Sequence, residues 1–167
     1  MNPDLFPSYF KEYIEKVPEG DPQELLQIGI RDTLSTLAMV SEERANESYE
    51  VGKWSIKDIV QHMIDTERIF CYRALAIARG ESERLLGYNH DEYADYANAT
   101  NRSLKSLLEE FKNLRQSTID LFSGFAADML QRKGNANGME VSVDQLQYIL
   151  IGHELHHLWV IQQKYLS

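Results

Sequence analysis

The amino-acid sequence predicts an all-α protein: a four-helix bundle with a short extra N-terminal helix and two long connections. Glycine and proline are sparse, with 9 and 4 copies in 167 residues, so few positions interrupt a helix. The segments between them repeat apolar side chains at the helical period, and no convincing pair of strands is visible. Four segments of about 22–24 residues would give helices about 33–36 Å long, which are the proportions of such a bundle.

The expected helices follow one another along the chain. A short N-terminal helix is expected near Leu5–Val17, where the sequence PEGDP then stops it. The first and third bundle helices each repeat apolar residues on one face, which is the face expected to meet the core. We expect the four bundle helices at Gln23–Arg44, Ile56–Arg79, Thr100–Phe122 and Val143–Tyr165.

Two of these helices begin with the same capping pattern. Ser55 stands three residues before Asp58, and Ser142 stands three residues before Gln145. A serine followed at this spacing by an acid or an amide can form the reciprocal hydrogen bonds of a capping box. The starts of the second and fourth bundle helices are therefore predicted to within a residue or two.

The two long connections span residues 81–99 and 123–141. Links of this length can cross from one end of a bundle to the other, so a simple up-down-up-down order is not assured. They can also cover the mouth of a site, or serve only as connectors. The first connection places aromatic and histidine side chains among acidic residues: Tyr88, His90, Tyr93 and Tyr96.

Composition limits the classes of function. The net charge is −9, from 17 basic and 26 acidic residues, which argues against nucleic acid and against an anionic membrane surface as partners. No signal-peptide pattern and no apolar run of about 18 residues appear. The single cysteine, Cys71, cannot form an internal disulfide. We expect residues 1–167 to form one domain in the cytoplasm.

Histidines gather in the last bundle helix. The sequence GHELHHLWV, residues 152–160, contains three of the five histidines of the chain. His153 and His157 lie about 40° apart on the helix, within its apolar stripe, where unpaired polar groups are costly. A shared metal ion would satisfy both rings. On the second bundle helix, His62 lies at the border of the core face, with Asp58, Asp65 and Arg73 on its other side. Cys71 points away from His62 and is expected to be a packed thiol.

Two motif interpretations fail on the residues themselves. The sequence His153-Glu154-x-x-His157 matches the zinc-protease motif with Glu154 as general base. Only ten residues follow His157, and none is a histidine or an acid that could be the third ligand. A di-iron site would need a second Glu-x-x-His pair, but Ile59 stands three residues before His62. A third interpretation is a mononuclear site of three histidines, His62, His153 and His157, and a histidine cluster satisfied without a metal ion is its alternative.

The sequence WSIKDIVQHMIDTE, followed some ninety residues later by GHELHH, resembles the DinB/YfiT-like family of metalloenzymes. The resemblance covers nearly the whole chain. It implies a four-helix bundle, often a homodimer, with one divalent metal ion held by His62, His153 and His157. The characterised branches of the family are bacillithiol S-transferases and mycothiol-dependent isomerases, and many other members are described as metal-dependent hydrolases. No catalytic role is carried over to Glu154 or His156.

The three histidines predict a metal-dependent enzyme, and the resemblance implies that it uses a low-molecular-weight thiol as co-substrate, as an S-transferase acting on a small molecule. A hydrolase using metal-bound water and a non-catalytic metal-binding or sensing bundle are the alternatives. Zinc is the expected ion, because three neutral imidazoles with an open position are typical of catalytic zinc, although nickel or iron would also accept them. We expect binding to weaken as the pH falls through about 6.5, where free imidazole takes up a proton.

Overall fold

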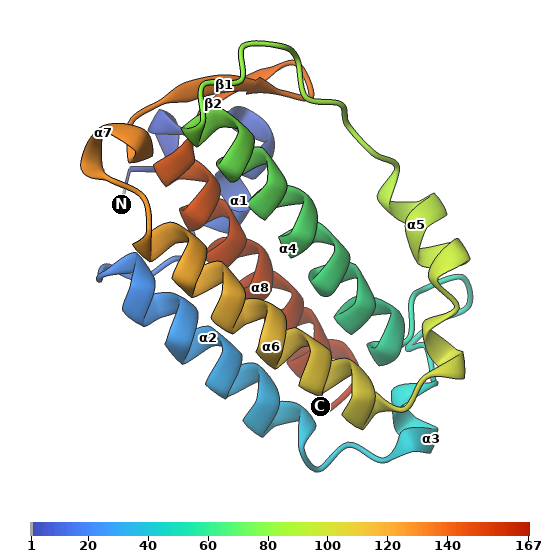
Figure 1. Cartoon of the computed structure of the whole chain (residues 1–167). Coiled ribbons are helices and arrows are strands. Elements are labelled where there is room, and N and C mark those ends of the chain that lie inside the picture. The colour runs from blue at the N-terminus through green and yellow to red at the C-terminus, as the bar shows by residue number, and fades with distance from the viewer. Residues whose placement is uncertain (1) are drawn as a thin grey trace.

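Four long helices form the body of the protein, in a computed structural model that describes residues 2–167. They are α2 (Pro22–Leu37), α4 (Ile56–Ala78), α6 (Leu104–Ser123) and α8 (Val143–Lys164), and they confirm the predicted all-α four-helix bundle (Figure 1). None of the described helices is long and apolar enough to cross a membrane. The remaining elements are short: 3-10 helices at Pro3–Leu5, Ser8–Phe10 and Ala99–Asn101, helices α1 (Lys11–Ile14), α3 (Glu42–Ala45), α5 (His90–Ala97) and α7 (Ala127–Leu130), and strands β1 (Lys133–Ala136) and β2 (Met139–Ser142).

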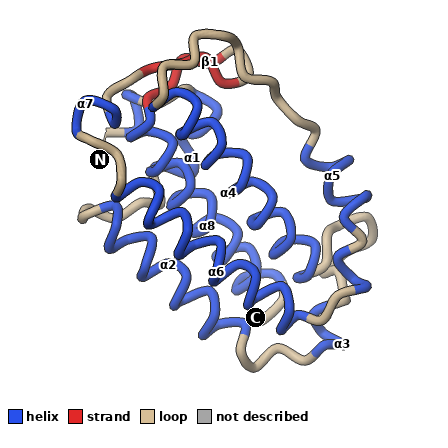
Figure 2. Tube along the Cα trace, viewed as in Figure 1, coloured by secondary structure: helices blue, strands red, loops and turns tan. Residues whose placement is uncertain are grey.

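The helices are not in up-down-up-down order. Helix α4 packs against both α6 and α8, and α2 packs against the same two helices from the other side. Helices α4 and α6 run in one direction, and α2 and α8 run in the opposite direction (Figure 1). The parallel pair requires residues 79–103 to return along the whole length of the bundle, and α5 lies beside α4 within this return (Figure 2). The long connection is therefore a crossover.

Capping chemistry fixes the starts of α4 and α8, as predicted. The Ser55 hydroxyl accepts a hydrogen bond from the Asp58 amide at 3.1 Å, and the Asp58 carboxylate accepts one from the Ser55 amide at 2.9 Å. Ser142 and Gln145 make the same reciprocal pair at 3.1 and 2.9 Å. Each pair satisfies two backbone donors that a helix start leaves free.

Other predicted boundaries were wrong, and local caps explain two of them. Helix α2 ends at Leu37 instead of continuing to residue 44, because the Ser41 hydroxyl accepts a hydrogen bond from the Arg44 amide and starts the separate helix α3. Helix α6 begins at residue 104 rather than 100, after Ser103 as its N-cap. The N-terminal segment contains only one turn of α-helix, which two 3-10 turns precede.

The expectation of no strand pair was also wrong. Strands β1 and β2 form an antiparallel hairpin whose turn is Asn137-Gly138. Both residues have positive φ, 55° and 84°, which is the backbone conformation that an Asn-Gly pair adopts most readily in a two-residue hairpin turn. Leu85 exchanges backbone hydrogen bonds of 2.9 Å with Asn135 and Asn137. The hairpin therefore holds the beginning of the crossover at one end of the bundle.

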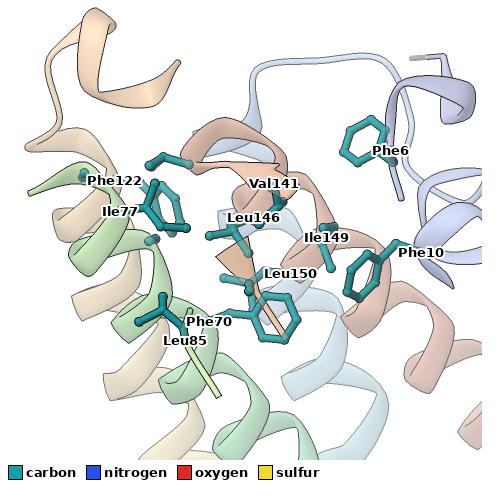
Figure 3. Close-up of a cluster of buried hydrophobic side chains, with 14 of the residues drawn as sticks. Phe6, Phe10, Phe70, Ile77, Leu85, Phe122, Val141, Leu146, Ile149 and Leu150 are labelled. Carbon is teal, nitrogen blue, oxygen red and sulfur yellow. The ribbon is translucent and has the colours of Figure 1, made fainter. Parts of the chain in front are cut away.

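The core at this end of the bundle is strongly apolar (Figure 3). It joins the N-terminal segment to α4, α8 and the hairpin, and its aromatic and aliphatic members include Phe6, Phe10, Phe70, Ile77, Phe122, Leu146, Ile149 and Leu150. The N-terminal segment also approaches α8 closely further along. A Cβ atom at Gly152 would lie 2.5 Å from the backbone oxygen of Tyr13, so only glycine allows this contact. Tyr13 is thereby placed beside the histidines that follow Gly152.

Candidate metal centre

Three histidines converge between α4 and α8. His62 comes from α4, and His153 and His157 stand one turn apart on α8. The Nε2 atom of His153 lies 3.0 Å from Nε2 of His62 and 3.0 Å from Nε2 of His157. One ring nitrogen of each histidine lies within 4.8 Å of the others. The structure thus brings together the three residues that the sequence singled out.

Hydrogen bonding alone does not account for this arrangement. The Nε2 atom of a neutral imidazole carries either one hydrogen or one lone pair. For His153, that single hydrogen or lone pair can serve only one of the two 3.0 Å contacts in good geometry. A metal ion accepts a lone pair from each ring, and ligand nitrogens about 2.0–2.1 Å from one ion lie roughly 3 Å apart. The donor set therefore fits a divalent cation.

Burial keeps the three rings neutral. His62 and His153 are each less than one-tenth exposed. Burial, together with the proximity of His90, lowers the pKa of His62 to about 4. Burial and the neighbouring histidines hold the pKa values of His153 and His157 well below the usual value for imidazole. Neutral imidazole is the form that binds a metal ion.

These pKa shifts change the pH dependence that the sequence suggested. Protons compete with the metal only below the pKa of the folded protein, which is about 4 for His62. We therefore expect zinc affinity to change little between about pH 7 and pH 5, and to fall steeply at lower pH. Titration of zinc against a chelator of known affinity, in buffers that cover this range, measures the profile. A loss of affinity centred near pH 6.5 would contradict the lowered pKa.

The neighbours of the three histidines do not point into the centre. Glu154 is buried and faces away, with its carboxylate 2.6 Å from Arg115 and 2.8 Å from the Thr33 hydroxyl. It cannot act as the base of a zinc protease in this position. The ring of His156 packs against Tyr13 instead of joining the cluster. Cys71 contacts Thr118, and burial raises the pKa of its thiol to about 11, so it is a packed thiol as predicted.

A cavity of about 190 Å³ opens beside the three rings. Its walls come from the N-terminal segment, α4, α8 and the first long connection, which supports the expectation that this connection covers a site. Among residues 2–167, no aspartate or glutamate lines the cavity. The lining residues are mostly aromatic or apolar: Tyr9, Phe10, Tyr13, Trp54, His62, Thr66, Phe70, Arg73, Tyr88, His90, Ile149, Leu150, His153 and His157.

Two aromatic rings besides those of His153 and His157 lie next to His62. The Trp54 ring is 4.8 Å away, and the His90 ring is 5.9 Å away, measured between ring centroids. Trp54 immediately precedes the N-cap of α4, and His90 is the first residue of α5, whose start Asn89 caps. Tyr93 and Tyr96, which the sequence also suggested as part of the cover, do not line the cavity.

A buried ionic network adjoins the centre and was not anticipated. Arg115 of α6 is 1% exposed and forms two parallel hydrogen bonds, of 2.9 and 2.8 Å, with the carboxylate of Glu67. A further donor of Arg115 reaches Glu154, the residue next to His153. Thr118 and Thr33 each donate to one of these carboxylates. The network joins α2, α4, α6 and α8 behind the histidines.

The fold and the site together define a class of protein. It is a parallel-crossover four-helix bundle in which the second and fourth long helices bring three imidazoles together beside a largely apolar cavity. The chain belongs to the DinB superfamily, whose sequence model matches residues 25–161. The family resemblance of the two histidine motifs is thereby confirmed.

Two solved structures share this fold. YfiT from Bacillus subtilis, described as a probable metal-dependent hydrolase with an unusual four-helix bundle topology, is similar with a TM-score of 0.78 and 12% identity, over 88% of this chain and 90% of that one. The mycothiol-dependent maleylpyruvate isomerase is similar with a TM-score of 0.68 and 13% identity, over 91% of this chain and 62% of that one. No curated protein matches the sequence.

Proposed function

We propose that the protein is a metal-dependent S-transferase, which joins a low-molecular-weight thiol to a small electrophile. The observation that carries the proposal is the lining of the cavity: aromatic and apolar beside the three histidines, with no carboxylate among the described residues. His62, His153 and His157 would hold the divalent ion. Zinc is the first candidate, and nickel and iron also accept imidazole ligands.

The lining favours thiol chemistry over hydrolysis because the two reactions need different groups. Hydrolysis by metal-bound water is commonly assisted by a general base, and the nearest carboxylate in sequence, Glu154, is held by Arg115 and Thr33. When bound, the cation would favour the thiolate form of a thiol, and because a thiol is far more acidic than water, thiol activation depends less on a separate base. The absence of a carboxylate from the cavity is therefore compatible with S-transfer.

The residues of the cavity suit an apolar acceptor. The rings of Phe10 and Phe70 meet edge to face at 6.0 Å, and together with Trp54 they offer apolar faces that exclude water. A second cavity shares Trp54 and His157 with the first and is more polar, because Lys53, Asp91 and His156 also line it. We assign the electrophile to the first cavity and the remainder of the thiol to the second.

The proposed reaction balances without a redox partner. The bond between sulfur and the acceptor carbon forms as the bond between that carbon and its leaving group breaks. The leaving group takes the electron pair of the broken bond, and the thiol proton is released to solvent. The aromatic walls keep water away from the acceptor carbon, so that sulfur is the nucleophile that reaches it.

Hydrolysis is the second candidate, and one observation favours it. The imidazole of His90 is half exposed, lies next to His62 and lines the first cavity, so it could accept a proton from water there. The description of YfiT as a probable metal-dependent hydrolase agrees with this alternative. The description of the other neighbour as mycothiol-dependent agrees with use of a thiol.

We expect zinc-loaded protein to accelerate thioether formation between a low-molecular-weight thiol and an aromatic electrophile. A suitable pair is glutathione or cysteine with 1-chloro-2,4-dinitrobenzene, followed by absorbance and by mass spectrometry of the adduct. Acceleration should disappear after removal of zinc and in His153→Ala, because the thiolate would no longer be stabilised.

The control reaction is hydrolysis of 4-nitrophenyl acetate by the same preparations. S-transfer predicts little zinc-dependent cleavage of this ester. If the ester is cleaved in a zinc-dependent way while no thiol forms an adduct with any electrophile of a quinoid and chlorinated panel, hydrolysis replaces S-transfer as the function. His90→Ala should then lower the rate of hydrolysis.

A further inference from the structure

Arg73 places a buried positive charge in the wall of the cavity. Its side chain is 5% exposed, and its guanidinium lies 5.2 Å from the ring centre of Phe70. One nitrogen, Nη2, donates a hydrogen bond of 2.9 Å to the backbone oxygen of Leu86. No other protein acceptor for the guanidinium is present among residues 2–167, so several N–H donors are left for a ligand.

The charge of Arg73 has no partner in the protein. No carboxylate of residues 2–167 lies within ion-pair distance of Arg73, and none lines the cavity that it faces. Buried charges in proteins are normally paired, because removal of an ion from water is costly. Arg115, the other deeply buried arginine, follows this rule, with two carboxylates against its guanidinium. Arg73 does not, and an anionic ligand would supply the missing partner.

Arg73 lies on the same face of α4 as His62. Eleven residues separate them, which corresponds to about 20° around the helix and about 16 Å along it. Long side chains of a helix lean towards its N-terminus, and Arg73 does so over Phe70, which shortens the distance to the histidines. The Tyr88 hydroxyl, 2.7 Å from the Thr66 hydroxyl, lies in the wall between these two ends of the cavity.

We propose that the acceptor substrate carries a carboxylate that Arg73 binds, with the reacting carbon at the histidine end of the cavity and an apolar or aromatic body between them. The inference deepens the proposed function, because it assigns the class of acceptor to the same cavity. A guanidinium group can bind a carboxylate by donating two parallel N–H hydrogen bonds to its two oxygens. The thiol is not assigned to Arg73, because the second cavity meets the first at Trp54 and His157, and Arg73 does not line it.

The test measures binding and not turnover. Isothermal titration of zinc-loaded protein compares 3-phenylpropanoate with its neutral amide, 3-phenylpropanamide, at constant ionic strength. We expect the carboxylate to bind at least about tenfold more tightly than the amide, as a charge-assisted pair would provide. In Arg73→Gln this preference for the carboxylate should disappear. In Arg73→Lys it should be smaller but still present, because lysine keeps the positive charge but cannot form two parallel hydrogen bonds with a carboxylate.

Arg132→Gln is the matched control. Arg132 also donates to a backbone oxygen, that of Ala78, but pairs with Asp128 outside the cavity, so its replacement should leave the preference unchanged. Amide binding and the thermal midpoint of Arg73→Gln report whether the cavity is intact. If Arg73→Gln does not fold, Arg73→Lys provides the comparison.

Three results would overturn the inference. The first is equal binding of carboxylate and amide by the unaltered protein, and the second is an unchanged preference in Arg73→Gln. The third concerns glutathione, a thiol that carries carboxylates. If Arg73 is needed to bind glutathione but not to bind 3-phenylpropanoate, Arg73 binds the thiol and not the acceptor. None of these measurements depends on S-transfer activity. If the protein does not catalyse S-transfer, the prediction that Arg73 binds a carboxylate still stands or falls on these binding data.

Discussion

His62→Ala is expected to weaken zinc binding as severely as His153→Ala or His157→Ala, by at least about 100-fold. Each change removes one of three converging nitrogens. Replacing a residue that only orients a ligand already costs about 10- to 100-fold in metal affinity, and loss of a ligand itself costs more. Elemental analysis after purification at neutral pH should find about one ion per chain in the unaltered protein. Titration against a chelator of known affinity then gives the loss in each variant.

The controls are His156→Ala and His90→Ala, for which we expect a much smaller effect. His156 stands on the same helix turn but packs on Tyr13, and His90 borders the cavity without joining the converging nitrogens. Intact affinity in His62→Ala combined with its loss in His156→Ala would place the site on α8 alone. Absence of zinc uptake by the unaltered protein would remove the site altogether.

Local chemistry explains which parts of the fold could be predicted. The capping pairs at Ser55 and Ser142 lie within three residues of the helix starts that they fix, so the sequence is sufficient. Ser41 and Ser103 also cap helices, but Arg44 and Ser106 stand three residues after them instead of an acid or an amide, so the capping-box pattern is missing. The Asn137-Gly138 turn carried a direct hairpin signal, and its strands of four residues are too short to show an alternating pattern.

In the candidate site too, features within one helix could be predicted from the sequence, and features that depend on long-range packing could not. His153 and His157 could be paired from the helical period, whereas the position of His62 at the edge of its core face indicated no function by itself and the family resemblance identified it as a ligand. Tyr13 could not be placed there, because the contact at Gly152 joins parts of the chain far apart in sequence. Arg73 was expected on the polar side of α4, which was wrong: its side chain is buried and lines the same cavity as His62. The sequence could not show that no carboxylate faces Arg73, because the crossover and the N-terminal segment supply the residues around it.

The buried network of Arg115 is the clearest case of a long-range feature. A single arginine in an apolar stripe gives no indication of its partners, and Glu67 and Glu154 come from helices on either side of it in the sequence. Burial raises the pKa of Glu154, and Arg115 opposes this rise. The arginine therefore allows two carboxylates to stay in the core behind the histidines.

Arg115→Met is expected to lower the free energy of unfolding by about 3–5 kcal/mol at neutral pH, because removal of one partner from a buried ionic group leaves uncompensated charge. Methionine fills much of the volume, so the loss reports mainly on charge and hydrogen bonding. Without Arg115, the pKa of Glu154 should rise further above that of the unfolded chain, because burial already raises it and Arg115 is the main group that opposes the rise. The folded variant would then bind more protons than the unfolded one, and its stability deficit should shrink as the pH falls. Urea unfolding at about pH 7 and pH 5 measures both effects.

Arg68→Met is the matched control for this loss. Arg68 also links α4 to α6, through Glu110 at 2.6 Å, but its side chain is 49% exposed. Exposed pairs of this kind contribute about 0.2–1 kcal/mol, so the control should change stability by no more than that. In the Arg115→Met background, Glu67→Gln together with Glu154→Gln should recover part of the lost stability, since neutral amides need no counter-charge. If Arg115→Met cost no more than Arg68→Met, or if the two glutamine changes deepened its loss, charge pairing would not be what holds these residues in the core.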